Sequence, residues 1–141
     1  MVILDTNVLS ELMARRPQAA VMAWADAQRR DQLVTTAVNV MELHSGLHLI
    51  KPGKRRQELA TMLDWTLDEL LGGRVLNFDR RASLTAAELY AKRRALGQTV
   101  DLRDTMIGAI ALGRRIPIAT RNTIHFGDLD VKVIDPWKDA G

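Results

Sequence analysis

Three carboxylates stand in apolar surroundings, widely separated along the sequence. Asp5 comes directly after the apolar run 2–4, and an acidic side chain at the end of a buried parallel strand points into the crevice beside the sheet. Glu42 lies among small and apolar residues of an expected helix, so it needs a partner or a cation. Asp104 shares a helix face with Ile107, as in a core-facing stripe. These positions indicate a cation site.

A fourth polar position follows another expected strand. Thr120, Arg121 and Asn122 come after residues 116–119, a strand that we expect to end at the same sheet edge as the strand before Asp5. Oxygen ligands alone suit Mg²⁺ or Mn²⁺ and not Zn²⁺. A phosphodiester is the natural substrate, because a hard cation lowers the pKa of a bound water and neutralises charge on phosphorus oxygens.

Each carboxylate also has a purely structural interpretation. Asp5 is suited to cap a helix or to end a turn. Glu42 can swing into solvent or pair with a nearby arginine. Asp101 is a natural N-cap, and Asp104 suits the first helical turn through the helix dipole. The two interpretations agree if Asp101 caps the helix while Asp104 points inward.

The elements that must position these residues alternate between strands and helices. Apolar runs predict five short strands, at 2–4, 33–36, 75–77, 116–119 and 131–134. Helical periodicity, caps and breakers predict six helices, at 6–13 (capped by Thr6 or Asn7), 17–29, 38–50, 55–71, 80–96 and 102–114. This alternation describes an α/β three-layer sandwich, whose ligand site lies outside the carboxyl ends of the strands.

The length and composition of the chain limit the kinds of protein that it can be. A chain of 141 residues is expected to form one domain, 1–141, and its 47% hydrophobic content argues against disorder. The absence of cysteine excludes disulfides and thiolate chemistry. A net charge of +3 permits a polyanionic partner without requiring one. The N-terminal apolar run is too short for a signal peptide and no stretch is long enough to cross a bilayer, so we expect a cytoplasmic protein without membrane contact.

The same residues resemble a known family in order and spacing. The segments are 3–9 (ILDTNVL), Glu42 with Gly46, 104–111 (DTMIGAIA) and 120–122 (TRN). Together they resemble PIN-domain proteins over the whole chain. The ending 133–137 (VIDPW) resembles that of the VapC and FitB-like toxin branch.

The resemblance implies a fold, an activity and partners. The fold would be a five-stranded parallel sheet in an α/β/α sandwich. The activity would be endonucleolytic cleavage of RNA that depends on Mg²⁺ or Mn²⁺, with Asp5, Glu42 and Asp104 as metal ligands. The chain would form a homodimer or a toxin–antitoxin hetero-oligomer with a VapB- or FitA-like antitoxin. The antitoxin's C-terminal segment would block the active site, and its other end would bind promoter DNA.

Asn122 departs from the family pattern, because many PIN domains have a fourth acidic residue there. We therefore expect one tightly held metal and a second that binds weakly. Either Asp101 or Asp128 is able to supply a compensating charge. Residues that we expect to orient water or phosphate around the metal are Thr6, Asn7, Thr120 and Asn122, and Arg121 is a candidate phosphate contact.

Other polar and aromatic residues have plainer interpretations. His44 and His48 are spaced as a metal pair, but they lack the intervening glutamate of zincins and a third ligand, so they are expected on a helix surface. His125 is expected to pack in a loop. The tryptophans are expected in the core or at a dimer interface, and they stand at 24, 65 and 137.

Two alternative functions stay open. A haloacid-dehalogenase-type phosphatase also begins with a strand ending in aspartate, but it needs a second aspartate where this chain has Asn7. A non-catalytic PIN-like module, acting through RNA or protein contacts alone, gains support from Asn122. The three carboxylates speak against it.

Overall fold

A five-stranded parallel sheet forms the centre of the computed structural model, which describes residues 1–139. The strand order is β3-β2-β1-β4-β5, and every neighbouring pair is parallel. The strands are β1 (Val2–Leu4), β2 (Leu33–Thr36), β3 (Val75–Leu76), β4 (Ile118–Ala119) and β5 (Val133–Ile134). Because β1 is central and all strands run the same way, whatever follows β1 lies at the middle of the carboxyl edge.

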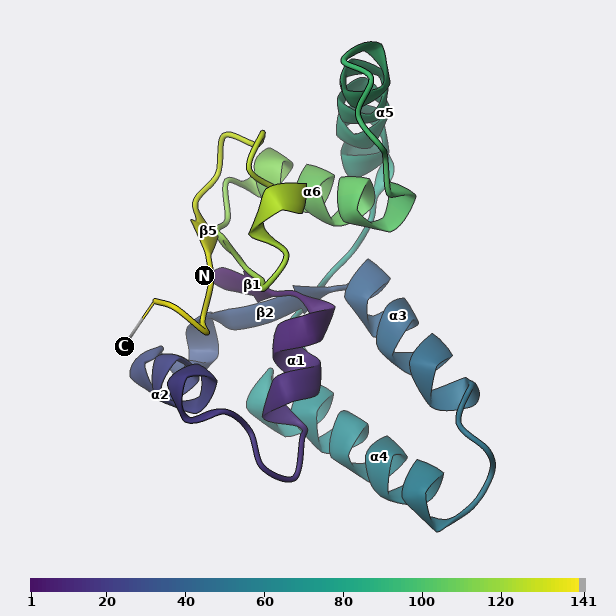
Figure 1. Cartoon of the computed structure of the whole chain (residues 1–141), viewed down its shortest axis with the longest axis vertical. Coiled ribbons are helices and arrows are strands. Elements are labelled where there is room, and N and C mark those ends of the chain that lie inside the picture. The colour runs from purple at the N-terminus through teal and green to yellow at the C-terminus, as the bar shows by residue number, and fades with distance from the viewer. Residues whose placement is uncertain (140–141) are drawn as a thin grey trace.

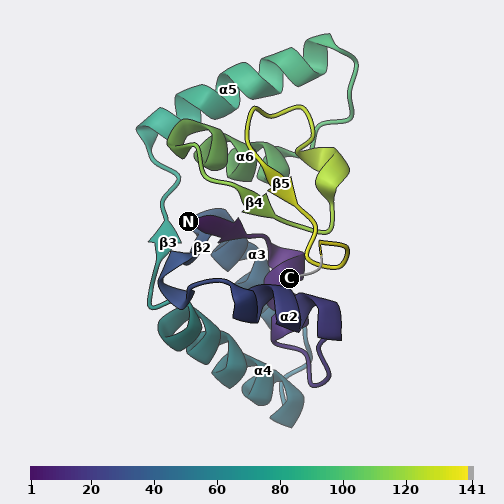
Figure 2. The same ribbon diagram turned by 90° about the vertical axis from the view of Figure 1, so that its left-hand side faces the viewer.

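Helices cover both faces of this sheet (Figure 1). They are α1 (Thr6–Leu12), α2 (Ala19–Ala27), α3 (Ala37–His48), α4 (Lys54–Trp65), α5 (Arg80–Ala95) and α6 (Leu102–Arg114). Short turns of other helix types are η1 (Arg30–Gln32), η2 (Thr66–Leu70) and η3 (Thr123–His125). Figure 2 shows α5 and α6 on one side of the sheet and α2 and α4 on the other. The predicted three-layer fold with a five-stranded parallel sheet is confirmed.

The alternation of side chains along β1 builds two cores. Ile3 packs on one face with buried residues of α5 and α6, including Leu89 and Ile107. Val2 and Leu4 pack on the other face with residues of α1, α2, α3 and α4. Both faces of the strand are therefore apolar, as is expected for a parallel sheet covered on each side. Trp24 lies in the second core, whereas Trp65 is half-exposed.

The predicted elements all exist, and those predicted at 2–4, 33–36 and 102–114 have the predicted ends. The cap of α1 is Asp5 and not Thr6 or Asn7, since Asp5 Oδ1 accepts from the Thr6 backbone N at 2.8 Å. The strand predicted at 116–119 begins at Ile118, because the Ile116 N–H is used to close α6 on the Ala111 carbonyl. The strand predicted at 131–134 begins at Val133.

The ends of five predicted helices also shift, and the helices predicted at 6–13 and 80–96 each end one residue earlier. The helix predicted at 17–29 spans Ala19–Ala27. The helix predicted at 38–50 ends at His48. The helix predicted at 55–71 is α-helical only to Trp65 and then widens into the π-helical turn η2. Within residues 1–139, none of the helices is both long and apolar enough to span a membrane.

One ion pair, between a buried arginine and a partly exposed aspartate, fixes the loop between β4 and β5. Arg93 of α5 is buried and donates from Nε and Nη2 to both carboxylate oxygens of Asp128, at 2.9 and 2.8 Å. It also donates to the Thr105 hydroxyl and to the His125 carbonyl. Hydrogen bonds from Arg93 lower the pKa of Asp128. Arg93 thereby ties α5, α6 and η3 together.

Replacing Arg93 by methionine should lower the free energy of unfolding by about 2–4 kcal/mol, because three partners then lose a buried donor. Chemical denaturation of the purified protein measures this change. Arg94→Met is the matched control: Arg94 is exposed beside Tyr90, and its loss should cost under about 1 kcal/mol. Equal effects of the two variants would contradict this role of Arg93.

Candidate functional site

Asp5 is a buried carboxylate held only by neutral donors. Its Oδ1 accepts from Thr6 N and from Asn39 Nδ2 at 2.9 Å, and its Oδ2 accepts from the Thr120 hydroxyl at 2.7 Å. The residue is 4% exposed, and no Lys, Arg or His in residues 1–139 pairs with it. Burial raises the pKa of Asp5, and the charge of Asp104 raises it further. The donors orient the carboxylate but leave its charge uncompensated.

Glu42 belongs to the same hydrogen-bond network through Thr6. The Thr6 hydroxyl donates to Glu42 Oε1 at 3.1 Å and accepts from Asn39 Nδ2 at 3.0 Å. Asn39 therefore connects both carboxylates, and Thr36 at the N-cap of α3 fixes its side chain. Burial raises the pKa of Glu42, as does the charge of Asp5. The exposed side chain of Arg103 forms an ion pair with Glu42, with its Nη1 3.6 Å from Glu42 Oε2.

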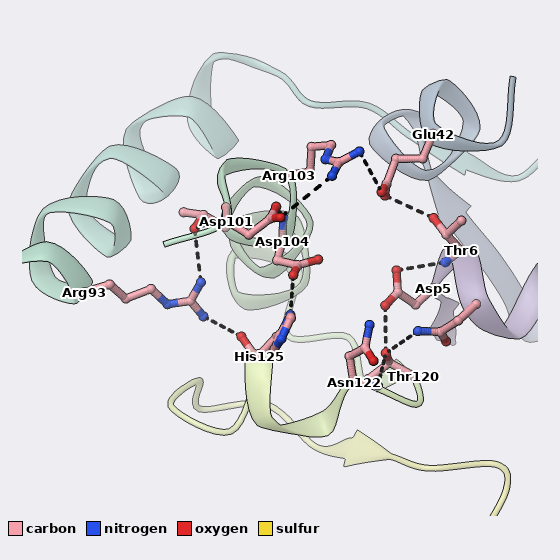
Figure 3. Close-up of polar contacts among 12 residues, drawn as sticks. Asp5, Thr6, Glu42, Arg93, Asp101, Arg103, Asp104, Thr120, Asn122 and His125 are labelled. Atoms are coloured by element: carbon pink, nitrogen blue, oxygen red, sulfur yellow. Dashed lines mark hydrogen bonds and ion pairs between the residues drawn. The ribbon is translucent and has the colours of Figure 1, made fainter. Parts of the chain in front are cut away.

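Asp101 and Asp104 have different roles: Asp101 caps the helix, and Asp104 faces the other carboxylates. Asp101 caps α6, because its Oδ1 accepts from Asp104 N at 3.1 Å. Asp104 Oδ2 pairs with His125 Nδ1. The charge of Asp104 raises the pKa values of both Asp5 and Glu42, so the three carboxylates lie within electrostatic reach of one another. Figure 3 shows them around one space, approached from β1, α3 and α6.

The turn after β4 closes the site from the other side. The Thr120 hydroxyl accepts from Asn7 Nδ2 at 3.3 Å and from Asn122 N at 3.0 Å while donating to Asp5. Asn7 Oδ1 accepts from Arg121 N. The Asn122 side chain turns toward Asp5 and Asp104 (Figure 3). The Arg121 guanidinium lies over the Trp137 ring, 5.1 Å from its centroid, where a cation–π contact holds it.

Two hollows flank the carboxylates. A largely apolar groove of about 310 Å³ lies between α1, α3 and α4 and has Thr6 and Glu42 in its wall. A polar hollow of about 530 Å³ lies beside α6 and has Asp101, Asp104 and His125 in its wall. Glu42 thus lines one hollow and Asp104 the other, while the buried Asp5 lines neither.

The side-chain oxygens at this site fit a hard divalent cation in chemical type and charge. As placed, however, they do not form a complete coordination shell. Carboxylates with hydroxyl and amide oxygens nearby are ligands of Mg²⁺ and Mn²⁺. Across the part of the chain that the structure describes, no three His, Asp or Glu side chains are close enough to grip an ion as placed. Glu42 and Asp104 face Arg103 and His125 instead. Of the three carboxylates, Asp5 is the one that has no arginine or histidine partner.

Three contributors escaped the sequence analysis. Asn39 was missed, although a threonine cap at Thr36 and a polar residue three positions later mark the start of α3. Arg103 was missed, although it stands between two aspartates. For His125 the expectation of simple loop packing is wrong, since its half-exposed ring faces Asp104. His48, by contrast, lies exposed and contacts Arg56, away from the site.

Comparisons with known proteins agree on one family. A family model described as PIN domain matches residues 2–132. Plasmid stability protein StbB of Pseudomonas syringae pv. tomato is 41% identical over 98% of this chain and 99% of that protein. VapC ribonuclease Y4jK of Sinorhizobium fredii is 39% identical over 99% of this chain and 100% of that protein. The crystal structure of FitAcB from Neisseria gonorrhoeae is similar with a TM-score of 0.88 and 33% identity, over 98% of this chain and 99% of that one.

The uncompensated charge of Asp5 makes a prediction about stability. Because the pKa of Asp5 is raised above its ordinary value of 3.8, the folded chain binds this proton more tightly than the unfolded chain, so the ionised group costs stability at neutral pH. Asp5→Asn keeps the cap and the two hydrogen bonds that Oδ1 accepts, and it loses only the bond from the Thr120 hydroxyl, because an amide nitrogen cannot accept. In EDTA at neutral pH the Asp5→Asn substitution should raise the Tm, by about 3–5 °C for each kcal/mol added to the free energy of unfolding.

Thermal unfolding followed by circular dichroism measures this difference. The wild-type protein in EDTA should gain stability as the pH falls from neutral to mildly acidic, and the gain should shrink in Asp5→Asn. Asp31→Asn, an exposed aspartate paired with Arg29, is the control. A lower Tm for Asp5→Asn than for the wild type would refute the description of Asp5 as a strained charge.

Proposed function

The chain belongs to the PIN-domain family, as a VapC/FitB-type member, and from this we propose that it is a metal-dependent endoribonuclease, the toxin of a toxin–antitoxin module. The observation that carries the proposal is the buried, uncompensated Asp5 carboxylate facing Glu42 and Asp104. A structural ion pair would not leave the most buried of three carboxylates without a cation. A site built to bind a divalent ion would leave that carboxylate free of a protein cation.

Asp5, Glu42 and Asp104 are the residues that would hold Mg²⁺ or Mn²⁺, which when bound lowers the pKa of a water and neutralises charge on the scissile phosphate. Thr6, Asn39 and Thr120 keep the Asp5 carboxylate in a fixed orientation.

Carboxylates not saturated by hydrogen bonds are suited to take the proton of the attacking water. Asp104 is one, since its Oδ2 alone is engaged by His125. Water attacks phosphorus in line and gives a proton to the carboxylate, and the bond to the 3′ oxygen breaks. That oxygen takes a proton from solvent, to which the carboxylate returns its own, so the products carry a 5′-phosphate and a 3′-hydroxyl. Asn7 and Asn122, at the rim, orient the water or the phosphate.

The partner in this proposal is the cognate antitoxin, a VapB- or FitA-like protein. Solved structures of this fold include FitAB bound to an IR36 DNA fragment and VapBC2 bound to a promoter fragment. Promoter DNA is accordingly contacted through the antitoxin and not by this chain alone. The assembly is a homodimer of the toxin or a hetero-oligomer with the antitoxin.

A non-catalytic PIN-like module is the second candidate, and one observation favours it. Arg103 neutralises part of the acidic cluster at Glu42 without a metal, and the His125 ring occupies one oxygen of Asp104. A binding module would retain such pairs permanently. EDTA-sensitive RNA cleavage by the isolated protein separates the two candidates.

Asp5→Asn should abolish RNA cleavage while stabilising the fold. We expect Mg²⁺- or Mn²⁺-dependent cleavage of a structured RNA by the wild-type protein, complete inhibition by EDTA, and a loss of at least about 10³-fold in rate for the variant. Gel analysis of end-labelled RNA measures it, with Asp31→Asn as the active control. Wild-type rates in the folded Asp5→Asn variant would contradict the assignment.

Asn122 should limit the number of metal ions. With three carboxylates and a neutral amide, the free protein should bind one Mn²⁺ tightly and a second at least about tenfold more weakly, because the second ion lacks a carboxylate. Isothermal titration calorimetry reports both steps. Asn122→Asp should tighten the second step, whereas two equally tight sites in the wild type would refute the expectation.

A further inference from the structure

Arg103 reaches two of the acidic side chains at the site. It stands in the first turn of α6 with its side chain 55% exposed. Its Nη1 lies 3.6 Å from Glu42 Oε2, and its Nη2 lies 3.8 Å from Asp101 Oδ2. The guanidinium thus bridges α3 and α6 above the carboxylates (Figure 3). None of the proposed steps described above uses it.

These contacts are too weak to explain the residue as a structural brace. Both distances exceed those of a good charge-assisted hydrogen bond, and the side chain is mostly in solvent. Exposed ion pairs of this kind contribute about 0–1 kcal/mol. The Arg103 side chain is therefore free to exchange its partners at little cost.

The negative charge of the site indicates which new partner the Arg103 side chain would take in place of Glu42 and Asp101. Four carboxylates, those of Asp5, Glu42, Asp101 and Asp104, face a substrate that is itself a polyanion. Within residues 1–139, Arg103 is the single Lys or Arg that pairs with any of them. The planar guanidinium fork matches the oxygens of a phosphate diester as it matches a carboxylate.

Among residues 1–139, Arg93 and Arg121 also lie near the site, but neither pairs with any of these four carboxylates. Arg93 is buried and satisfied by Asp128, Thr105 and the His125 carbonyl. The Arg121 guanidinium, the candidate from the sequence, lies over Trp137.

We propose that Arg103 is the phosphate-binding residue of this site and that it serves as the counter-ion of Glu42 and Asp101 until RNA arrives. This rests on the proposed function, since it assigns the RNA contact of the same nuclease centre. A divalent cation and Arg103 compete for Glu42, and RNA relieves the competition by drawing the guanidinium to a phosphate next to the one cleaved.

The proposal predicts two effects of opposite sign. Arg103→Gln removes a positive charge beside the carboxylates, so the free protein should bind Mn²⁺ about three- to tenfold more tightly. The same change removes a phosphate contact, so RNA should bind about three- to tenfold more weakly, and the salt dependence of log K should fall by about 0.7–1. A residue with a merely structural role moves neither quantity in this way.

The experiment compares three variants with the wild-type protein. Arg103→Gln tests the charge, and Arg103→Lys keeps the charge but not the fork. Arg29→Gln is the matched control, an exposed arginine paired with Asp31 before the start of β2, at the opposite edge of the sheet. Calorimetry with Mn²⁺ gives the metal affinity. Fluorescence anisotropy of a short single-stranded RNA in Ca²⁺ gives RNA affinity across a salt series, and circular dichroism confirms that each variant is folded.

The outcomes separate this proposal from the one it rests on. Tighter Mn²⁺ binding with weaker, less salt-dependent RNA binding in Arg103→Gln, intermediate values in Arg103→Lys and none of these changes in Arg29→Gln support it. Unchanged Mn²⁺ and RNA affinities in a folded Arg103→Gln variant of an RNA-cleaving protein overturn it alone. Absence of RNA cleavage by the wild-type protein with every divalent metal overturns the proposed function.

Discussion

A carboxylate that the fold buries without giving it a counter-charge is the constraint on which the rest of the site depends. Asp5 ends the central strand, caps α1 and accepts three hydrogen bonds from neutral groups, yet it faces two further acidic side chains. Such an arrangement costs stability in the free chain, and the cost is recovered only when something positive binds. The surrounding Thr and Asn side chains hold the charge in place rather than neutralise it.

Some other charged side chains of the protein, unlike Asp5, have charged partners. The buried Arg93 forms a bidentate pair with the partly exposed Asp128, which lowers the pKa of Asp128 and fixes the loop after β4. That loop carries η3, and His125 in η3 reaches Asp104. One satisfied ion pair thus positions an edge of the site whose own charges are only loosely paired. Strong pairs build the framework, and weak pairs stand where ligands must enter.

Sequence patterns predicted the fold and the carboxylates because each depends on local signals. Apolar runs and caps located all five strands and six helices, and a carboxylate after β1 or in an apolar helix face is conspicuous in a sequence. The contacts of Asn39, Arg103 and His125 were not predictable, because each joins elements far apart in the chain through a side-chain direction that no spacing encodes. The stacking of Arg121 on Trp137 was likewise not predictable, because the two residues meet through their side chains across a loop and a strand.

The most direct test of a shared ion at Asp5, Glu42 and Asp104 is anomalous X-ray diffraction from crystals of the purified protein grown with Mn²⁺. We predict one strong anomalous peak roughly 2–2.5 Å from an oxygen of Asp5 and from an oxygen of Glu42 or Asp104, the range of hard-cation ligands. A peak elsewhere, or none with the carboxylates still facing Arg103 and His125, would contradict the account.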